Sequence, residues 1–144
     1  MENPIEELEE ASSPPNLVDA MKEIKAGERS VSFGWTDTKL GDSLQSVEDL
    51  CDLLVKSKTH ALDLDSAKLN NATVEQMCNA LKKNKSLRTL VLTNNNLGAL
   101  AGKAIVDMLK LNKTLKQISL QEGNPDIPKA TFEAIEAILL ARSS

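Results

Sequence analysis

Residues 85–112 read KSLRTLVLTNNNLGALAGKAIVDMLKLN, and the chain starts the same pattern again at Lys113 with KTLKQISLQEGN. The pattern also fits the stretch before it, where Leu62 and Leu64 stand in place of two of its leucines. A period of about 28 residues is typical of proteins that stack strand–turn–helix units, because each unit buries its apolar face against the next. The sequence therefore predicts a solenoid rather than a domain closed around a pocket.

Each unit is expected to contain a short strand, a turn and a helix. Alternation across a strand directs Leu90 and Leu92 inward and leaves the residues between them on the outer face. Asn95 is expected to bond the backbone where the strand ends and the chain turns. After Gly98 the spacing becomes helical, with an apolar face formed by Leu100 or Ala101, Ala104, Ile105, Met108 and Leu109.

The neighbouring units follow this pattern less closely. Val31 and Phe33 are the expected inward pair of the first unit, and Ile118 and Leu120 that of the last one. A helix over residues 16–26, ending at Gly27, is expected to cover the first layer. Residues 1–15 are expected to be a disordered acidic segment, and residues 16–144 a single domain.

The phrase LxxLxLxxNxL, followed by a helix, resembles the ribonuclease-inhibitor class of leucine-rich repeats. Two positions depart from it: Ala67 occupies the place of the turn asparagine, and Thr59 or His60 that of a leucine. The resemblance implies a right-handed α/β solenoid of about four parallel strands on a concave face, with helices on the convex face. Residues 107–115, DMLKLNKTL, also resemble the leucine-rich domain of tropomodulins, which implies actin or filament ends as a partner.

Composition narrows the classes of function. The chain has a formal charge of −4 and only 2% aromatic residues, so no basic stripe with stacking side chains predicts a nucleic-acid partner. No apolar run is long enough to span a membrane, and the acidic start MENPIEELEE is unlike a signal peptide, so we expect a cytoplasmic protein without a membrane partner. Cys51 and Cys78 occupy equivalent helical positions and are interpreted as reduced, buried thiols.

An enzyme is not expected. His60 is the only histidine and no catalytic triad order occurs, so we expect neither a cofactor nor a metal. Asp63 and Asp65 lie on the same outer face of one strand, about 7 Å apart by strand geometry. An acidic patch in solvent, a partner contact, and acid–base catalysis or metal binding are the alternatives for this pair.

The favoured function is a noncatalytic protein-interaction module, with a tropomodulin-like regulator of the actin cytoskeleton as the alternative. The predicted partner-binding residues are the outward positions of successive strands: Asp63, Asp65, Thr89, Val91, Thr93, Gln117, Ser119 and Gln121, beside Ser30, Ser32, Gly34 and Ala61. Trp35 is either a partner anchor or a buried residue. Lysines near the helix ends either complement the helix dipoles or bind an acidic partner. The last strand, over 115–120, is expected to leave a free sheet edge, a candidate dimer contact.

Overall fold

The computed structural model describes residues 16–33 and 39–142. The expectations for residues 1–15, Gly34 and Trp35 lie outside the described residues. In chain order the elements are α2 (Leu17–Lys25), β1 (Ser30–Ser32), the short 3-10 helix η1 (Leu40–Asp42), α3 (Leu44–Lys56), β2 (Ala61–Asp63), α4 (Asn71–Leu81), β3 (Thr89–Val91), α5 (Ala99–Leu111), β4 (Gln117–Ser119) and α6 (Lys129–Leu140).

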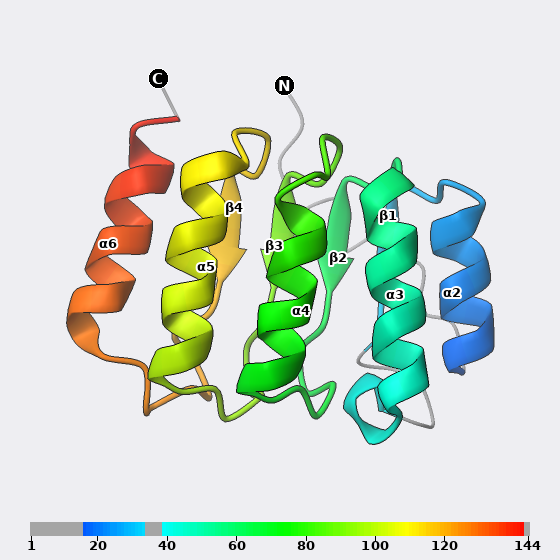
Figure 1. The fold of residues 1–144 in the computed structure, drawn as a ribbon, viewed down its shortest axis with the longest axis horizontal. Helices are drawn as coiled ribbons and strands as arrows, with labels where there is room; N and C mark the ends of the chain where they lie inside the picture. The colour runs from blue at the N-terminus through cyan, green and yellow to red at the C-terminus, as the bar shows by residue number, and fades with distance from the viewer. Residues whose placement is uncertain (1–15, 34–38, 143–144) are drawn as a thin grey trace.

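The four strands form one parallel sheet in the order β1-β2-β3-β4, and the helices lie side by side over one of its faces (Figure 1). The register aligns Leu62 with Leu90 and Leu90 with Ile118, so each of these steps equals one repeat period. The step from Val31 to its partner Leu62 is slightly longer, because the first unit carries η1 in its turn. The predicted α/β solenoid is therefore confirmed, including its looser first unit.

The core is mostly aliphatic and continuous along the solenoid. The expected inward residues Val31, Phe33, Leu62, Leu90 and Leu92 are all buried. They pack against the apolar stripes of the helices, where Ala101 rather than the exposed Leu100 completes the face of α5. Stacking of such layers removes most of the apolar surface of neighbouring units from water, which is the main stabilising term for a repeat fold.

Asparagines join neighbouring units through buried hydrogen bonds. At the strand ends, Asn95 accepts hydrogen bonds from the backbone N–H groups of Ala67 and Leu69, so its predicted role in the turn is confirmed. At the helix ends, Asn112 donates to the carbonyl of Leu81 in the preceding unit at 2.7 Å. These bonds satisfy backbone groups that a helix or strand end would otherwise leave unpaired in the core.

Arg142 continues the second of these rows beyond the last unit. Its guanidinium donates to the carbonyl of Leu115 at 2.7 Å and to that of Leu109 at the end of α5. No further unit follows α6 in the described residues, so an arginine does here what an asparagine does in the repeats. The start of α5 is capped across units as well, because Asn71 accepts from the N–H groups of Gly98 and Ala101.

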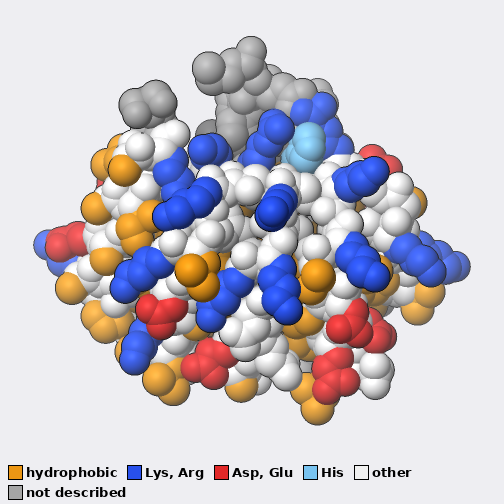
Figure 2. Space-filling view, turned by 45° about the horizontal axis from the view of Figure 1, so that its top comes forward, with side chains coloured by type: hydrophobic (Ala, Val, Ile, Leu, Met, Phe, Trp, Pro, Cys, Tyr) orange, Lys and Arg blue, Asp and Glu red, His pale blue; other side chains and the backbone are white. Residues whose placement is uncertain are grey.

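The parallel order places all helix-to-strand connections along one edge of the molecule. In Figure 2 this edge carries many Lys and Arg side chains, and acidic side chains lie further down the helices. No helix among the described residues is long and apolar enough to cross a membrane.

Candidate functional site

The predicted outer face is formed by the strand residues that alternate with the core leucines. The register sets Ser30, Ala61, Thr89 and Gln117 in one row across the sheet. The next row comprises Ser32, Asp63, Val91 and Ser119. The structure thus brings the predicted residues of neighbouring strands together.

Burial divides this face into two parts. Thr89 and Val91, on the inner strand β3, are 0% and 9% exposed and offer almost no side-chain surface to a partner. A residue of an inner strand has neighbours about 4.8 Å away on both sides, which shields a short side chain. The predicted role of these two residues as partner contacts does not fit their burial, and the predicted outer residues Ser30, Ser32 and Ala61 are buried as well. The half-buried or exposed members are Asp63, Asp65, Thr93, Gln117, Ser119 and Gln121.

Asp65 holds the turn after β2 to the turn after β3. One of its carboxylate oxygens accepts a hydrogen bond from the Thr93 hydroxyl at 2.6 Å and another from the Asn94 amide at 2.8 Å. The other oxygen accepts from Ser66 at 3.1 Å. Hydrogen bonds to an ionised carboxylate are stronger than those between neutral groups, so this carboxylate is firmly positioned.

The two carboxyl groups are shifted in opposite directions. Burial raises the pKa of Asp63, and the charge of Asp65 adds to this, although hydrogen bonds from the Asp65 N–H and the Ser32 hydroxyl oppose it. Burial alone would also raise the pKa of Asp65, but hydrogen bonds from Thr93, Asn94 and Ser66 and the charge of Lys39 together lower it. The fold therefore favours the ionised form of Asp65 and disfavours the ionised form of Asp63.

The hydrogen bonds of this carboxyl pair favour a structural role over acid–base catalysis. Both oxygens of Asp65 are engaged in hydrogen bonds, and His60 precedes Ala61 at the other end of β2. In residues 16–33 and 39–142, no group of three or more His, Cys, Asp or Glu side chains could hold a metal ion. Asp65 thus joins the turns after β2 and β3 and lies beside the half-buried residues of the outer face.

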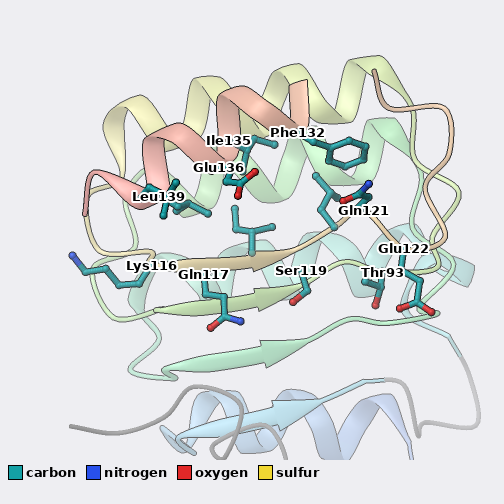
Figure 3. Close-up of a pocket in the computed structure, with 13 residues that line it drawn as sticks. Thr93, Lys116, Gln117, Ser119, Gln121, Glu122, Phe132, Ile135, Glu136 and Leu139 are labelled. Atoms are coloured by element: carbon teal, nitrogen blue, oxygen red, sulfur yellow. The ribbon is translucent and has the colours of Figure 1, made fainter. Parts of the chain in front are cut away.

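An open groove of about 640 Å³ lies between β4 and α6 (Figure 3). The predicted residues Thr93, Gln117, Ser119 and Gln121 form its polar side. Its apolar side comes mainly from α6 and β4, and comprises Phe132, Ile135, Leu139, Ile118 and Leu120. Small-molecule and peptide sites commonly combine such an apolar wall with a few polar groups.

The groove also follows the free edge of the sheet. β4 is the last strand of the sheet, and no described strand lies beyond it. The N–H of Gln117 donates to the carbonyl of Arg88, and the carbonyl of Ser119 accepts from the N–H of Leu92. In a parallel ladder the residue between two such partners directs its N–H and C=O away from the neighbour, so those of Ile118 face the open edge.

The polar side of this groove was predictable from strand alternation, but its apolar side was not. The repeat pattern interprets Ile135 and Leu139 as core residues of the last helix, and Ile135 is indeed buried. Phe132 and Leu139 are only half-buried, because α6 is the last helix described and no further helix covers it. The apolar side arises because no described helix packs on the outer face of α6, whereas the repeat pattern assumes a neighbour there.

Comparisons with known proteins give a likeness of fold. No protein-family model and no curated protein sequence matches the chain. A solved structure of leiomodin-1 actin-binding site 2 is similar, with a TM-score of 0.62, 13% identity and coverage of 90% of both chains. The tropomodulin C-terminal domain of Caenorhabditis elegans is similar with a TM-score of 0.54 and 10% identity, over 88% of this chain and 92% of that one. The described residues thus form a short leucine-rich-repeat solenoid like those of these two domains.

Proposed function

We propose that this chain is a noncatalytic protein-interaction module that binds a segment of a partner protein in the groove between β4 and α6. The observation that carries the proposal is the convergence of three features in one place. A free strand edge offers the N–H and C=O of Ile118, Phe132 and Leu139 offer apolar contacts, and Gln117 and Ser119 offer hydrogen-bonding side chains.

An extended segment is the ligand that suits these features. It adds main-chain hydrogen bonds to the edge strand, while alternate side chains enter the apolar side of the groove. The polar outer residues then set its register. Asp65 belongs to this surface through Thr93, which lines the groove and donates to the carboxylate.

Affinity capture with a matched control tests this proposal. Ser119→Arg places a long cationic side chain at the half-buried outer position of β4, and Leu100→Arg makes the same charge change at an exposed site on α5. We expect proteins retained by the wild type and by Leu100→Arg to be lost with Ser119→Arg, at unchanged circular dichroism. Retention of the same proteins by both variants contradicts binding in the groove.

Actin is the second candidate partner, and the likeness to leiomodin-1 actin-binding site 2 is the observation that favours it. A cytoskeletal role in the cytoplasm belongs to this candidate, and the free thiols Cys51 and Cys78 agree with a reducing compartment. Cosedimentation with filaments and elongation assays at pointed ends test it. The expected result is binding or slowed elongation at micromolar protein, and a flat result at that concentration rejects it.

A further inference from the structure

One edge of the solenoid concentrates positive charge. The last turns of the helices and the connections that lead from them into the strands, or past α6 to residue 142, contain thirteen of the 17 Lys and Arg residues but only two acidic residues. Its middle, here called the basic rim, comprises Lys56, Lys58, Lys83, Lys85, Lys113 and Lys116. All six are exposed, and none forms an ion pair among the described residues.

Helix dipoles do not account for the rim. A cation gains from the dipole only within the last turn of a helix. Lys56 meets this condition, but Lys58, Lys85 and Lys113 lie beyond the ends of α3, α4 and α5. Six cations along one edge repel each other without an internal partner, so an external anion stabilises them.

Exposed aliphatic side chains interrupt the rim at a repeat-equivalent position. Val55, Lys83 and Leu111 follow one another at one repeat period, and the aliphatic two are 39% and 64% exposed. Because equivalent positions of a solenoid lie in line, these three side chains alternate apolar, basic and apolar along the edge. A ligand that matches them carries both acidic and apolar groups.

The surroundings of the rim favour a narrow ligand. Carboxylates such as Asp52, Glu75 and Asp107 stand on the adjoining helix faces, and Figure 2 shows acidic side chains beside the basic edge. A bilayer or a nucleic-acid duplex is a broad anionic surface and meets these carboxylates too. Membrane insertion also requires a continuous apolar face, and base stacking requires aromatic side chains, which the rim lacks.

We infer that the basic rim is a second interaction surface, and that it binds an acidic segment of a protein in which glutamate or aspartate alternates with aliphatic residues. The carboxylates pair with Lys83, Lys85 and Lys113, and the aliphatic residues cover Val55 and Leu111. Lys116 of the basic rim also lines the groove between β4 and α6, but these five residues do not, so substitutions among them test the rim independently of the proposed function.

Fluorescence anisotropy with a fluorescein-labelled peptide of Glu-Glu-Leu repeats tests the inference on the whole chain. We expect binding that weakens as salt rises, and a loss of about tenfold or more in Lys83→Glu/Lys113→Glu, because two ion pairs are lost and each charge reversal adds repulsion. The matched control is Lys103→Glu/Lys129→Glu, which makes the same change of net charge at exposed lysines outside the rim. Equal losses in the two double variants overturn the inference, because net charge alone then explains the binding.

The aliphatic contribution has its own pair of variants. Leu111→Ser and Leu100→Ser alter leucines of similar exposure at opposite ends of α5, and only Leu111 lies between lysines of the basic rim. Weaker peptide binding by Leu111→Ser alone supports the inference, and equal binding by both overturns the aliphatic part of it. Vesicles of equimolar phosphatidylcholine and phosphatidylserine and a DNA duplex are the competing ligands. Tighter binding to either one than to the peptide, with the same loss in Lys83→Glu/Lys113→Glu, overturns the assignment to a protein segment.

Discussion

Asn95 and Asn124, in successive turns, donate to the same carbonyl, that of Leu92, at 3.1 and 3.0 Å. Leu92 lies just after β3, so one buried carbonyl joins its own turn to the next unit. The side-chain oxygen of Asn124 accepts from the N–H of Leu97, as that of Asn95 does from Leu69 in the turn before. Units of the solenoid are therefore held together by side-chain-to-backbone bonds as well as by apolar packing.

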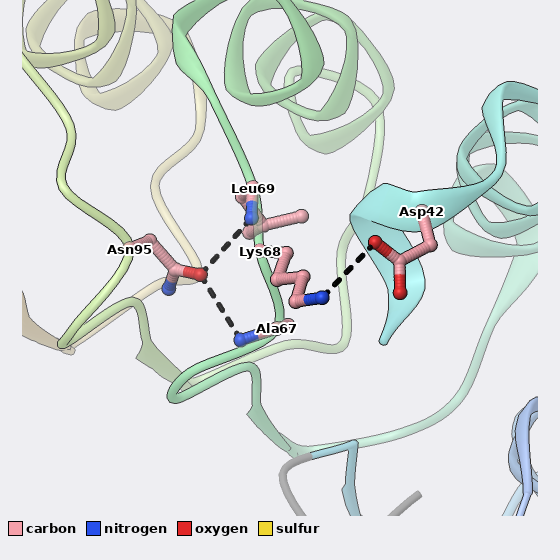
Figure 4. A network of polar contacts seen from close by, with 5 residues as sticks. All are labelled: Asp42, Ala67, Lys68, Leu69 and Asn95. Carbon is pink, nitrogen blue, oxygen red and sulfur yellow. Dashed lines mark hydrogen bonds and ion pairs between the residues drawn. The ribbon is translucent and has the colours of Figure 1, made fainter. Parts of the chain in front are cut away.

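The buried amide of Asn95 gives the first prediction. Asn95→Ala leaves the N–H groups of Ala67 and Leu69 without their partner in the core (Figure 4). It does the same to the carbonyl of Leu64. We expect a loss of about 3 kcal/mol or more in the free energy of unfolding, because each buried group left unpaired costs roughly 1–3 kcal/mol. Urea denaturation measures it. Asn79→Ala, at an exposed site on α4, is the control and is expected to change stability by less than about 0.5 kcal/mol.

The close approach of Gly41 to the backbone of Lys68 gives the second prediction. A Cβ atom at Gly41 would lie 1.8 Å from the carbonyl oxygen of Lys68, a backbone atom that cannot swing aside. We expect Gly41→Ala to destabilise the fold by about 3 kcal/mol or more, because the turn after β2 must move away from η1. Gly98→Ala is the matched control, since its Cβ would meet its nearest atoms at 3.5 Å or beyond. Equal melting temperatures of the two variants would show that the turn is not tightly packed.

The register of the sheet and the position of its core were predictable from the repeat itself. A constant step of one repeat period superposes Leu62, Leu90 and Ile118, and the structure pairs them. The role of Asn95 was predictable because one well-formed copy of the turn carries it. The sequence also shows that Ala67 replaces the asparagine in the previous turn. It does not show that a backbone hydrogen bond from the N–H of Gly41 to the carbonyl of Ala67, at 2.9 Å, joins the two turns there instead.

Several features that depend on contacts between units could not be predicted from the sequence. Alternation alone assigns Thr89 to the outer face, but its burial depends on what lies on both sides of β3. Arg142 bonds carbonyls 27 and 33 residues away, and no repeat pattern predicts an arginine in place of an asparagine. The groove arises in the same way, because its apolar side exists only where the next helix is missing in the described residues.

The two thiols give a prediction about reactivity. Burial raises the pKa of the Cys51 thiol to about 11, with help from the charges of Asp52 and Glu48, and burial raises that of Cys78 to about 12. At neutral pH their thiolate fractions are smaller than that of a thiol at 9.0 by about a hundredfold and about a thousandfold. We expect iodoacetamide to label the folded protein slowly, Cys51 before the more buried Cys78, and both at similar rates in urea. Mass spectrometry measures this order, and rapid labelling of Cys78 in the folded state contradicts it.

Asp63 and Asp65 give a prediction in which two neighbouring carboxyl groups affect stability in opposite directions. The folded-state pKa of Asp63 lies above 3.8, so its contribution to stability is complete below that value and is lost as the pH rises through the raised pKa. That of Asp65 lies below 3.8, so its contribution is present above 3.8 and is lost as the pH falls through the lowered pKa. Near neutral pH, Asp63→Asn is therefore expected to raise the free energy of unfolding, and Asp65→Asn to lower it by about 1–2 kcal/mol, because its hydrogen bonds lose their ionised acceptor.

Urea denaturation of the wild type and both variants, from neutral pH down past the pKa of an ordinary carboxyl, measures these effects. The gain in Asp63→Asn and the loss in Asp65→Asn must both shrink as the pH falls, since protonation removes the charge that each substitution removes. Asp107→Asn, at an exposed position of α5, controls for the change of net charge. If Asp63→Asn and Asp65→Asn shift stability in the same direction near neutral pH, then net charge rather than the hydrogen bonds from Thr93, Asn94 and Ser66 governs this part of the sheet.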